Sequence, residues 1–354
     1  MKTKNLLSLL LIAVVLIFAS CKKDDPSPLT KDQAVTALTT IDNGYATDVT
    51  DLAATQGHQV ADVLDGMNLP FGSLPQKSSA NAQTFLKEQK DILVESALSK
   101  RIVGGTPDFE FVPGTYTYEK STNSFTKTLS TPTDKMVLLF PFPISNANNN
   151  ATLTIYDYQS TTLLNSSVPT QLKGKIEIGG QTIWTIVATA AYSNLVNYNY
   201  NIVTTFGKFV STRQFSINIS NTQITSTALD ELKKDGAIVY QFSSNGVYKP
   251  SQTSFTADVN AKIIVKNIEI RIEFTFDFNT YQNVTDPNTI EKISVYTTDG
   301  AKVGDVKLVK VENSWIPYIF FNNGESKPVS EYFHNLLEFI GGCMESLYYN
   351  PNGK

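Results

Sequence analysis

The stretch KIIVKNIEIRIEFTFDF, residues 262–278, alternates apolar and polar side chains for most of its length. Successive side chains of a β-strand point to opposite faces, so the pattern predicts a strand with one apolar and one wet face. One face would carry Ile264, Lys266, Ile268, Ile270, Ile272, Phe274, Phe276 and Phe278, and the other Val265, Asn267, Glu269, Arg271, Glu273, Thr275 and Asp277. One wet face is typical of an antiparallel sheet and not of a doubly wound α/β fold. The run exceeds the usual strand length, which leaves open a bend within it.

Strand-forming composition extends to both sides of this run, over residues 105–325. The region is rich in Thr, Tyr, Phe, Val and Ile and is interrupted by Asn, Ser and Gly. The clearest hairpin signal is Gly179–Gly180, because glycine tolerates positive φ at both positions of a tight turn. Further turns are predicted at Lys120–Asn123, Asp299–Gly300 and Asn322–Gly324.

Helical periodicity precedes the β-region. Apolar residues at spacings of three and four predict a helix from Thr30, its N-cap, to about Gln56, with Gly57 able to end it. A shorter helical pattern runs up to Met67, and a third helix is expected at about Asn81–Arg101. Helices joined by short loops suggest an antiparallel helical subdomain over residues 30–104.

Two more helices complete the predicted fold. A short one is expected from Ala228 to Lys234, ended by Gly236, and a C-terminal one begins at about Ser330 within residues 326–354. The predicted fold class is therefore α+β and β-dominated. It combines an antiparallel curved sheet or sandwich with an N-terminal helical subdomain and a C-terminal helix.

The segment MKTKNLLSLLLIAVVLIFASCKKDDPSP, residues 1–28, has the organisation of a secretory signal. Lys2 and Lys4 precede an uncharged run from Leu6 to Ala19. This run has 14 residues, whereas a membrane-spanning helix needs roughly 20. A permanent transmembrane helix is therefore the weaker interpretation.

The segment Phe18-Ala19-Ser20-Cys21 resembles a lipobox, where bacterial lipoprotein signal peptidase cuts before a cysteine that becomes diacylated. Phe18 departs from the leucine that is usual there. The resemblance implies a signal peptide at residues 1–20, an acylated tether at residues 21–29, and a membrane anchor through acyl chains on Cys21, since two chains hold a protein stably at a bilayer. The alternative is an ordinary secretory signal with an incidental cysteine.

The segment Lys22–Asp25 resembles the charged tail that follows the cysteine in many surface lipoproteins of the Bacteroidota. In that family, acidic positions here favour export to the outer leaflet of the outer membrane. The resemblance implies a protein anchored to the outer membrane and exposed at the cell surface. The alternative is a solvated spacer on a protein that faces the periplasm.

The segment from Pro169 through Leu172, Ile176 and Gly180 to Ala191 resembles β-rich lipoproteins of the Bacteroidota. Those proteins also place a turn and a short helix near the C-terminus, as Asn323–Gly324 and Ser330–Ile340 do here. The family carries no assigned activity, so this resemblance implies no site.

Charge and cysteine content argue against a nucleic-acid partner and against a disulfide. Removal of residues 1–20 takes away two lysines and no acid, so 27 basic and 33 acidic side chains remain, a net charge of −6. Nucleic-acid binding needs a basic face, so no nucleic-acid partner is expected. The chain has two cysteines, and acylation of Cys21 would leave Cys343 without a disulfide partner. Cys343 lies in an apolar pattern, which favours a buried thiol.

Catalytic and metal chemistry find little support. His58 and His334 are far apart in sequence and lack metal-ligand spacing, and no G-x-S-x-G motif occurs. His58, which follows Gly57, is expected to be solvated. Asp277, Asp286 and Asp299 could offer oxygen ligands to calcium, but turn chemistry explains them better. No cofactor is expected.

Paired carboxylates leave glycoside hydrolysis open as an enzymatic function. Glu269, Glu273 and Asp277 lie on one face of the predicted strand, where alternate residues are about 6.6–6.8 Å apart. A glycosidase needs two carboxylates about 5–9.5 Å apart, so Glu273 with either neighbour would fit. Intervening Lys and Arg side chains favour a charge-balanced sheet surface instead.

Aromatic side chains support ligand binding more strongly, because planar rings stack on sugars or line apolar sites. Trp184 and Trp315 are the first candidates, and a half-buried tyrosine on a strand is the structural alternative. The tyrosines of the region are Tyr116, Tyr118, Tyr156, Tyr158, Tyr192, Tyr198, Tyr200 and Tyr248, and three of them (Tyr192, Tyr198 and Tyr200) lie among asparagines, as in a surface loop. The predicted function is a non-catalytic envelope lipoprotein that binds a glycan, a lipid or a protein partner. An assembly component of an outer-membrane complex is the alternative, and a carboxylate-dependent hydrolase is third.

Overall fold

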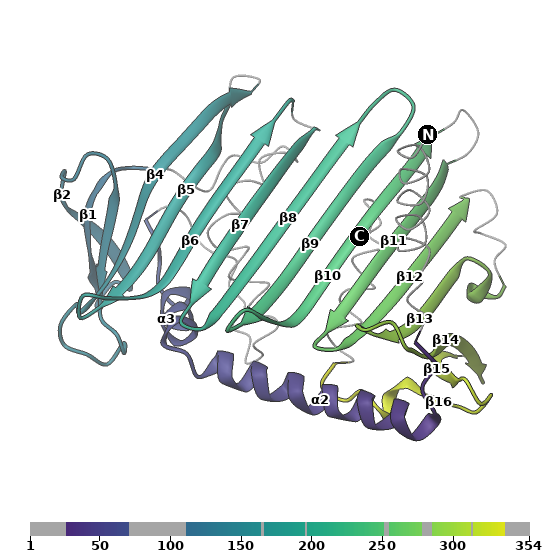
Figure 1. Ribbon diagram of the computed structural model, residues 1–354. Helices are drawn as coiled ribbons and strands as arrows, with labels where there is room; N and C mark the ends of the chain where they lie inside the picture. Colours follow the sequence, from purple (N-terminus) through teal and green to yellow (C-terminus); the bar gives the residue numbers. More distant parts are fainter. Residues whose placement is uncertain are drawn as a thin grey trace, which may run out of the picture.

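The computed structural model describes residues 26–70, 111–163, 166–194, 197–250, 255–277, 285–312 and 314–336. Within them, sixteen strands form one open sheet, with helices α2 (Lys31–Ala53) and α3 (Gln56–Asp65) along one end (Figure 1). The strands are β1 (Gly114–Glu119), β2 (Ser124–Leu129), β3 (Met136–Phe140), β4 (Ala151–Leu163), β5 (Ser166–Ile178), β6 (Gln181–Tyr192), β7 (Tyr198–Phe206), β8 (Phe209–Ile219), β9 (Ile224–Lys234), β10 (Ala237–Pro250), β11 (Phe255–Val265), β12 (Ile268–Asp277), β13 (Glu291–Thr297), β14 (Lys302–Val311), β15 (Ser314–Phe321) and β16 (Ser326–Pro328).

The strands follow one another in chain order across the sheet, from β16 to β3, and β1 and β2 complete it. The pairings along it are antiparallel apart from β1 with β3, which is parallel. The predicted β-dominated fold is confirmed. All the described strands share one sheet, so the sandwich alternative is not confirmed. The turns at Gly179–Gly180 and Asp299–Gly300 connect β5 to β6 and β13 to β14, as predicted.

Residues 262–277 of the alternating run form the end of β11 and the whole of β12, so the run is divided by a turn, where its length had left open a bend. The strands meet at a two-residue turn, Lys266–Asn267, where Lys266 has φ of 52° and Val265 pairs with Ile268. A two-residue turn reverses the phase of the alternation. The three consecutive apolar residues from Ile263 to Val265 hide that reversal in the sequence. Val265, and not Ile264, therefore shares a face with Ile268.

The segment Ala228–Lys234 lies in strand β9, so the short helix predicted there is wrong. The sequence ALDELKK has good helix formers, but β9 pairs along its whole length with β8 on one side and β10 on the other. Two complete ladders of hydrogen bonds override a weak local propensity. Leu232 is fully buried in the sheet's core.

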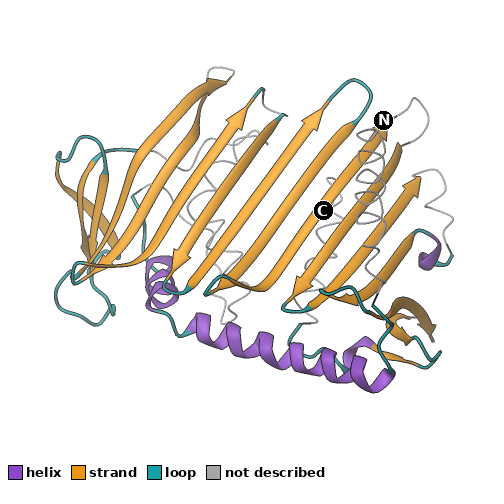
Figure 2. Cartoon of the chain, viewed as in Figure 1, coloured by secondary structure: helices purple, strands orange, loops and turns teal. Residues whose placement is uncertain are grey.

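Helix α2 begins at the predicted N-cap. Thr30 and Gln33 form a reciprocal capping box, in which the Thr30 side chain accepts from the Gln33 N–H and the Gln33 side chain accepts from the Thr30 N–H. The helix buries an apolar stripe that includes Leu38, Ile41 and Tyr45. It runs across the ends of the strands, along the row of hairpin turns (Figures 1 and 2).

Helix α2 ends at Ala53, earlier than Gly57, the predicted end. Thr55 caps a second helix, α3, by accepting from the N–H of His58, which places Gly57 in the first turn of α3. A Cβ on Gly57 would lie 2.7 Å from Cβ of Phe206 and 3.1 Å from the carbonyl oxygen of Ile183. Glycine is therefore needed for the close approach of helix and strand, not for ending a helix.

The C-terminal helix predicted from Ser330 does not begin there. The chain forms a 3₁₀ turn at Val329–Glu331 and continues without α-helix to Leu336, and the rest of this prediction lies outside the described residues. Cys21, Cys343 and the helix expected at Asn81–Arg101 also lie outside them.

The two faces of the sheet differ in burial. On β12, Ile268, Ile270, Ile272 and Phe274 are buried on the apolar face, while Arg271 and its alternate neighbours form the more exposed polar face. The apolar face continues across the sheet with large buried side chains such as Phe140, Phe206 and Phe209, which form its core. Neither described helix is both long and apolar enough to cross a membrane.

Candidate functional site

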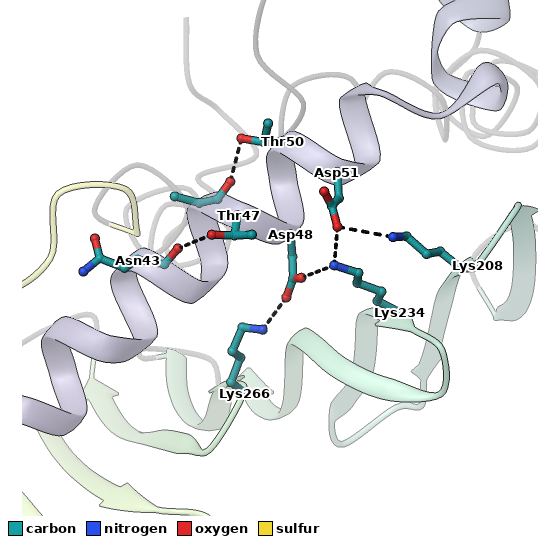
Figure 3. Close-up of polar contacts among 9 residues, drawn as sticks. Asn43, Thr47, Asp48, Thr50, Asp51, Lys208, Lys234 and Lys266 are labelled. Atoms are coloured by element: carbon teal, nitrogen blue, oxygen red, sulfur yellow. Dashed lines mark hydrogen bonds and ion pairs between the residues drawn. The ribbon is translucent and has the colours of Figure 1, made fainter.

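A group of charged side chains, here called the helix–turn ion network, joins α2 to three connections of the sheet (Figure 3). Asp48 and Asp51 come from the helix, and Lys208, Lys234 and Lys266 come from the turns or strand ends. Nζ of Lys234 lies 2.7 Å from Asp48 and 2.5 Å from Asp51, Lys208 lies 3.2 Å from Asp51, and Lys266 also bonds Asp48. The cations and carboxylates satisfy one another, which indicates a structural role.

The network has physical consequences for titration. Burial raises the pKa of Asp48, but hydrogen bonds from Lys234 and Lys266 lower it, and the lowering prevails. Hydrogen bonds from Lys234 and Lys208 lower the pKa of Asp51, and those from Lys234 to both carboxylates raise the pKa of the lysine. The sequence patterns do not predict this network. Each of its three lysines lies in or beside a turn of the structure, and none of these turns is predicted from the sequence.

A third carboxylate of α2, Asp42, holds the C-terminal part of the described chain. Its Oδ1 accepts hydrogen bonds from three successive backbone N–H groups, those of His334, Asn335 and Leu336, at 3.1, 2.9 and 3.0 Å. Its Oδ2 accepts a fourth bond, from the Asn335 side chain. Asp42 is 3% exposed, so these bonds satisfy a carboxylate that is almost fully buried.

The two histidines lie in different environments. His58 is buried in α3, contrary to the expected solvation, because α3 lies against β6 and β7. Its Nδ1 is 3.4 Å from Asp62, and burial lowers the pKa of His58 despite that carboxylate. His334 is exposed beside Asp42. The described residues contain no group of three or more His, Cys, Asp or Glu side chains suited to a metal ion.

The carboxylates considered for hydrolysis lie on the polar face of β12 among cations. Glu269 is 2.5 Å from Arg271 and 3.7 Å from Lys262, and Glu273 is 3.2 Å from Lys292. These ion pairs fit the charge-balanced surface that the sequence favoured over a catalytic pair.

The structure separates the two tryptophans. Trp184 is 2% exposed in β6, and Trp315 is 40% exposed in β15. Strands β7 to β14 lie between them, which at about 4.8 Å per strand separates them by roughly 40 Å. They cannot form one aromatic site.

Other aromatic side chains do come together on the apolar face, at the ends of β6–β8 far from α2. This aromatic cluster consists of Tyr192, Tyr198, Tyr200 and Phe215, with ring centroids 5.7–6.1 Å apart between neighbours. All four side chains are half-buried. The tyrosines lie on strands and not in the surface loop that the asparagines suggested. Phe215 was missed, because only cross-strand pairing with Tyr200 brings it there.

Polar and small side chains border the aromatic cluster. Directly paired residues share a face. One row across the strands therefore reads Tyr200, Phe215, Ala228, Ser244, Ala261 and Ile272. In the next row, Arg213 lies opposite Asp230, with Nε 3.8 Å from the carboxylate, and Tyr240 donates to Asp230 at 3.4 Å. The surface thus offers flat rings, a stretch of small side chains, and one ion pair.

The chain matches no protein-family model, no curated protein and no solved structure.

Proposed function

We propose that this chain is a non-catalytic lipoprotein of the cell envelope that binds a ligand on the apolar face of its sheet. The observation that carries the binding proposal is the aromatic cluster. Its four rings gather where the face is half-buried, whereas the same face is fully buried near α2. The lipobox-like segment supports an anchor through Cys21 in the outer membrane, with exposure at the cell surface.

The chemistry of the cluster favours a glycan as the ligand and a lipid as the second choice. Tyrosine rings stack on the apolar faces of sugars. Arg213, Asp230 and the tyrosine hydroxyls supply the few polar groups that orient a bound molecule. A lipid would instead contact the half-buried small side chains of Ala228 and Ser244 along the same row.

A thermal-shift screen of the purified chain against glycans and lipids tests this proposal. A ligand at 100 times its Kd stabilises a protein by about 2.7 kcal/mol, which raises Tm by roughly 5 °C at this size. Phe215→Ala should weaken binding by about tenfold or more, as expected for an aromatic anchor. Tyr318→Ala, a half-buried aromatic of β15, is the matched control and should leave the shift unchanged. Equal shifts in both variants would disprove the site.

An assembly role in an outer-membrane complex is the alternative. Flat curves with every ligand class would favour it, and crosslinking on intact cells would then identify the protein partner. The anchor is tested separately: if Cys21→Ser leaves the protein equally membrane-bound in cell fractions, the lipoprotein proposal fails.

A further inference from the structure

The free end of the β14–β15 hairpin exposes apolar side chains. Among the described residues, five large hydrophobic side chains are exposed, and two of them, Val311 (38%) and Trp315 (40%), lie here. Strand β13 pairs with β14 only as far as Val306, and β16 pairs with β15 only from Tyr318 onward. The hairpin end therefore extends beyond the strands that flank it.

Both faces of this hairpin end are apolar. Opposed pairs on one face are Leu308 with Pro317 and Lys310 with Trp315, and on the other Val309 with Ile316 and Val311 with Ser314. A protein partner would cover one face of such a hairpin and leave the other in water. An apolar medium that surrounds the hairpin would cover both.

The charges nearby complete the pattern of a lipid interface. Lys307 and Lys310 are exposed along β14, and Glu312 is the acidic residue at the tip. Tryptophan favours the boundary between headgroups and acyl chains, and lysine extends its ammonium group to anionic headgroups. Asn288 bonds both the N–H and the carbonyl oxygen of Leu308, each at 2.8 Å, so this part of the hairpin edge is already satisfied.

We propose that the end of the β14–β15 hairpin inserts shallowly into the lipid surface, with Val311 and Trp315 at the apolar boundary and Lys307 and Lys310 at the headgroups. This inference rests on the proposed anchor. The N–H of Leu29 donates to the carbonyl oxygen of Lys302 at 2.9 Å, so the chain leaves the fold beside the start of β14. Pro26 lies beside Gly300 in the turn before β14, so the tether from Pro26 to Cys21 reaches at most about 18 Å, whereas β14 is about 30 Å long. An anchored Cys21 and the hairpin end therefore meet the same membrane when β14 lies along its surface.

Tryptophan fluorescence can test this directly, because the chain has two tryptophans and Trp184 is buried in the sheet. The full acylated chain is reconstituted into anionic vesicles with or without brominated phospholipids, which quench only tryptophans in contact with lipid. Trp184→Phe, which retains Trp315, should lose most of its emission. Trp315→Phe, which retains Trp184, should lose none. If Trp184→Phe fails to fold, the quenching of the wild type minus that of Trp315→Phe gives the contribution of Trp315.

Charge variants and flotation complete the test. Lys307→Gln with Lys310→Gln should reduce quenching in anionic vesicles, while Lys262→Gln with Lys292→Gln, on the polar face, should not. Flotation reports the anchor and quenching reports the hairpin, so the two proposals can fail separately. Unquenched Trp315 in protein that floats with the vesicles would overturn the inference. Protection of Trp315 in native membranes but not in lipid vesicles would overturn it in favour of a protein partner.

Discussion

At the scale of single residues, Asp48 is a nearly buried carboxylate whose charge is balanced by two lysines. Its side chain is 7% exposed and bonds both Lys234 and Lys266. Asp48→Asn keeps the shape and removes the charge, which leaves two lysines without their shared partner. We expect the free energy of unfolding to fall by about 2 kcal/mol, below the cost of breaking a fully buried pair because both lysines are partly exposed. Urea unfolding measures this change. Asp157→Asn, which removes an exposed pair with Lys173, is the control and should change little.

The same network predicts how stability depends on pH. The pKa values of Asp48 and Asp51 are lowered in the folded state from 3.8, so the unfolded chain takes up more protons as the pH falls below about 4. Their stabilisation is therefore complete above that pH and is lost as the pH falls through the folded-state values. Tm measured from about pH 6 to pH 2 should drop less steeply in Asp48→Asn than in the wild type. Parallel curves would show that the network does not contribute.

At the scale of elements, the close contact of α3 with the sheet depends on one glycine. A Cβ at Gly57 would meet Phe206 at 2.7 Å and a backbone oxygen of β6 at 3.1 Å, and neither is the end of a flexible side chain. We expect Gly57→Ala to destabilise the protein by about 1–3 kcal/mol, as overpacking of a filled site does. Gly66→Ala is the matched control, since the nearest atom lies at 3.6 Å. Thermal unfolding measures the stability of both variants, and equal values would contradict the prediction.

The elements also show which patterns in the sequence are informative. Period-two alternation and glycine turns identify the sheet correctly, because each depends on neighbouring residues alone. The helix predicted at residues 228–234 is wrong because the strand conformation of this segment comes from pairing with β8 and β10, whose residues lie outside the segment. Phe215 was missed for the same reason. The tyrosines of the cluster were identified by type, but their grouping depends on strand register, which composition does not contain.

At the scale of the whole molecule, one helix spans much of the sheet. Helix α2 has 23 residues and is therefore about 34 Å long, close to seven strand spacings of about 4.8 Å. Its contacts agree: Lys31 bonds Glu325, after β15, and Asp51 bonds Lys208, between β7 and β8. Contacts at both ends of α2 therefore fix its position along the ends of the strands. The division into residues 30–104, 105–325 and 326–354 stays a prediction.

Asp42 joins α2 to residues 334–336, at the end of the described chain. Its removal should therefore weaken the attachment of that segment to the helix. Asp42→Ala leaves three partly or fully buried backbone N–H groups, at residues 334–336, without their acceptor. An orphaned buried donor costs about 1–3 kcal/mol, and local rearrangement will recover part of the total, so we expect a loss of about 3 kcal/mol. Hydrogen exchange should show these three amides losing protection before the core of the sheet does. Asn43→Ala, at the exposed neighbour on α2, should leave their exchange unchanged. If Asp42→Ala leaves it unchanged too, the helix does not hold the C-terminal segment, and the sheet alone positions it.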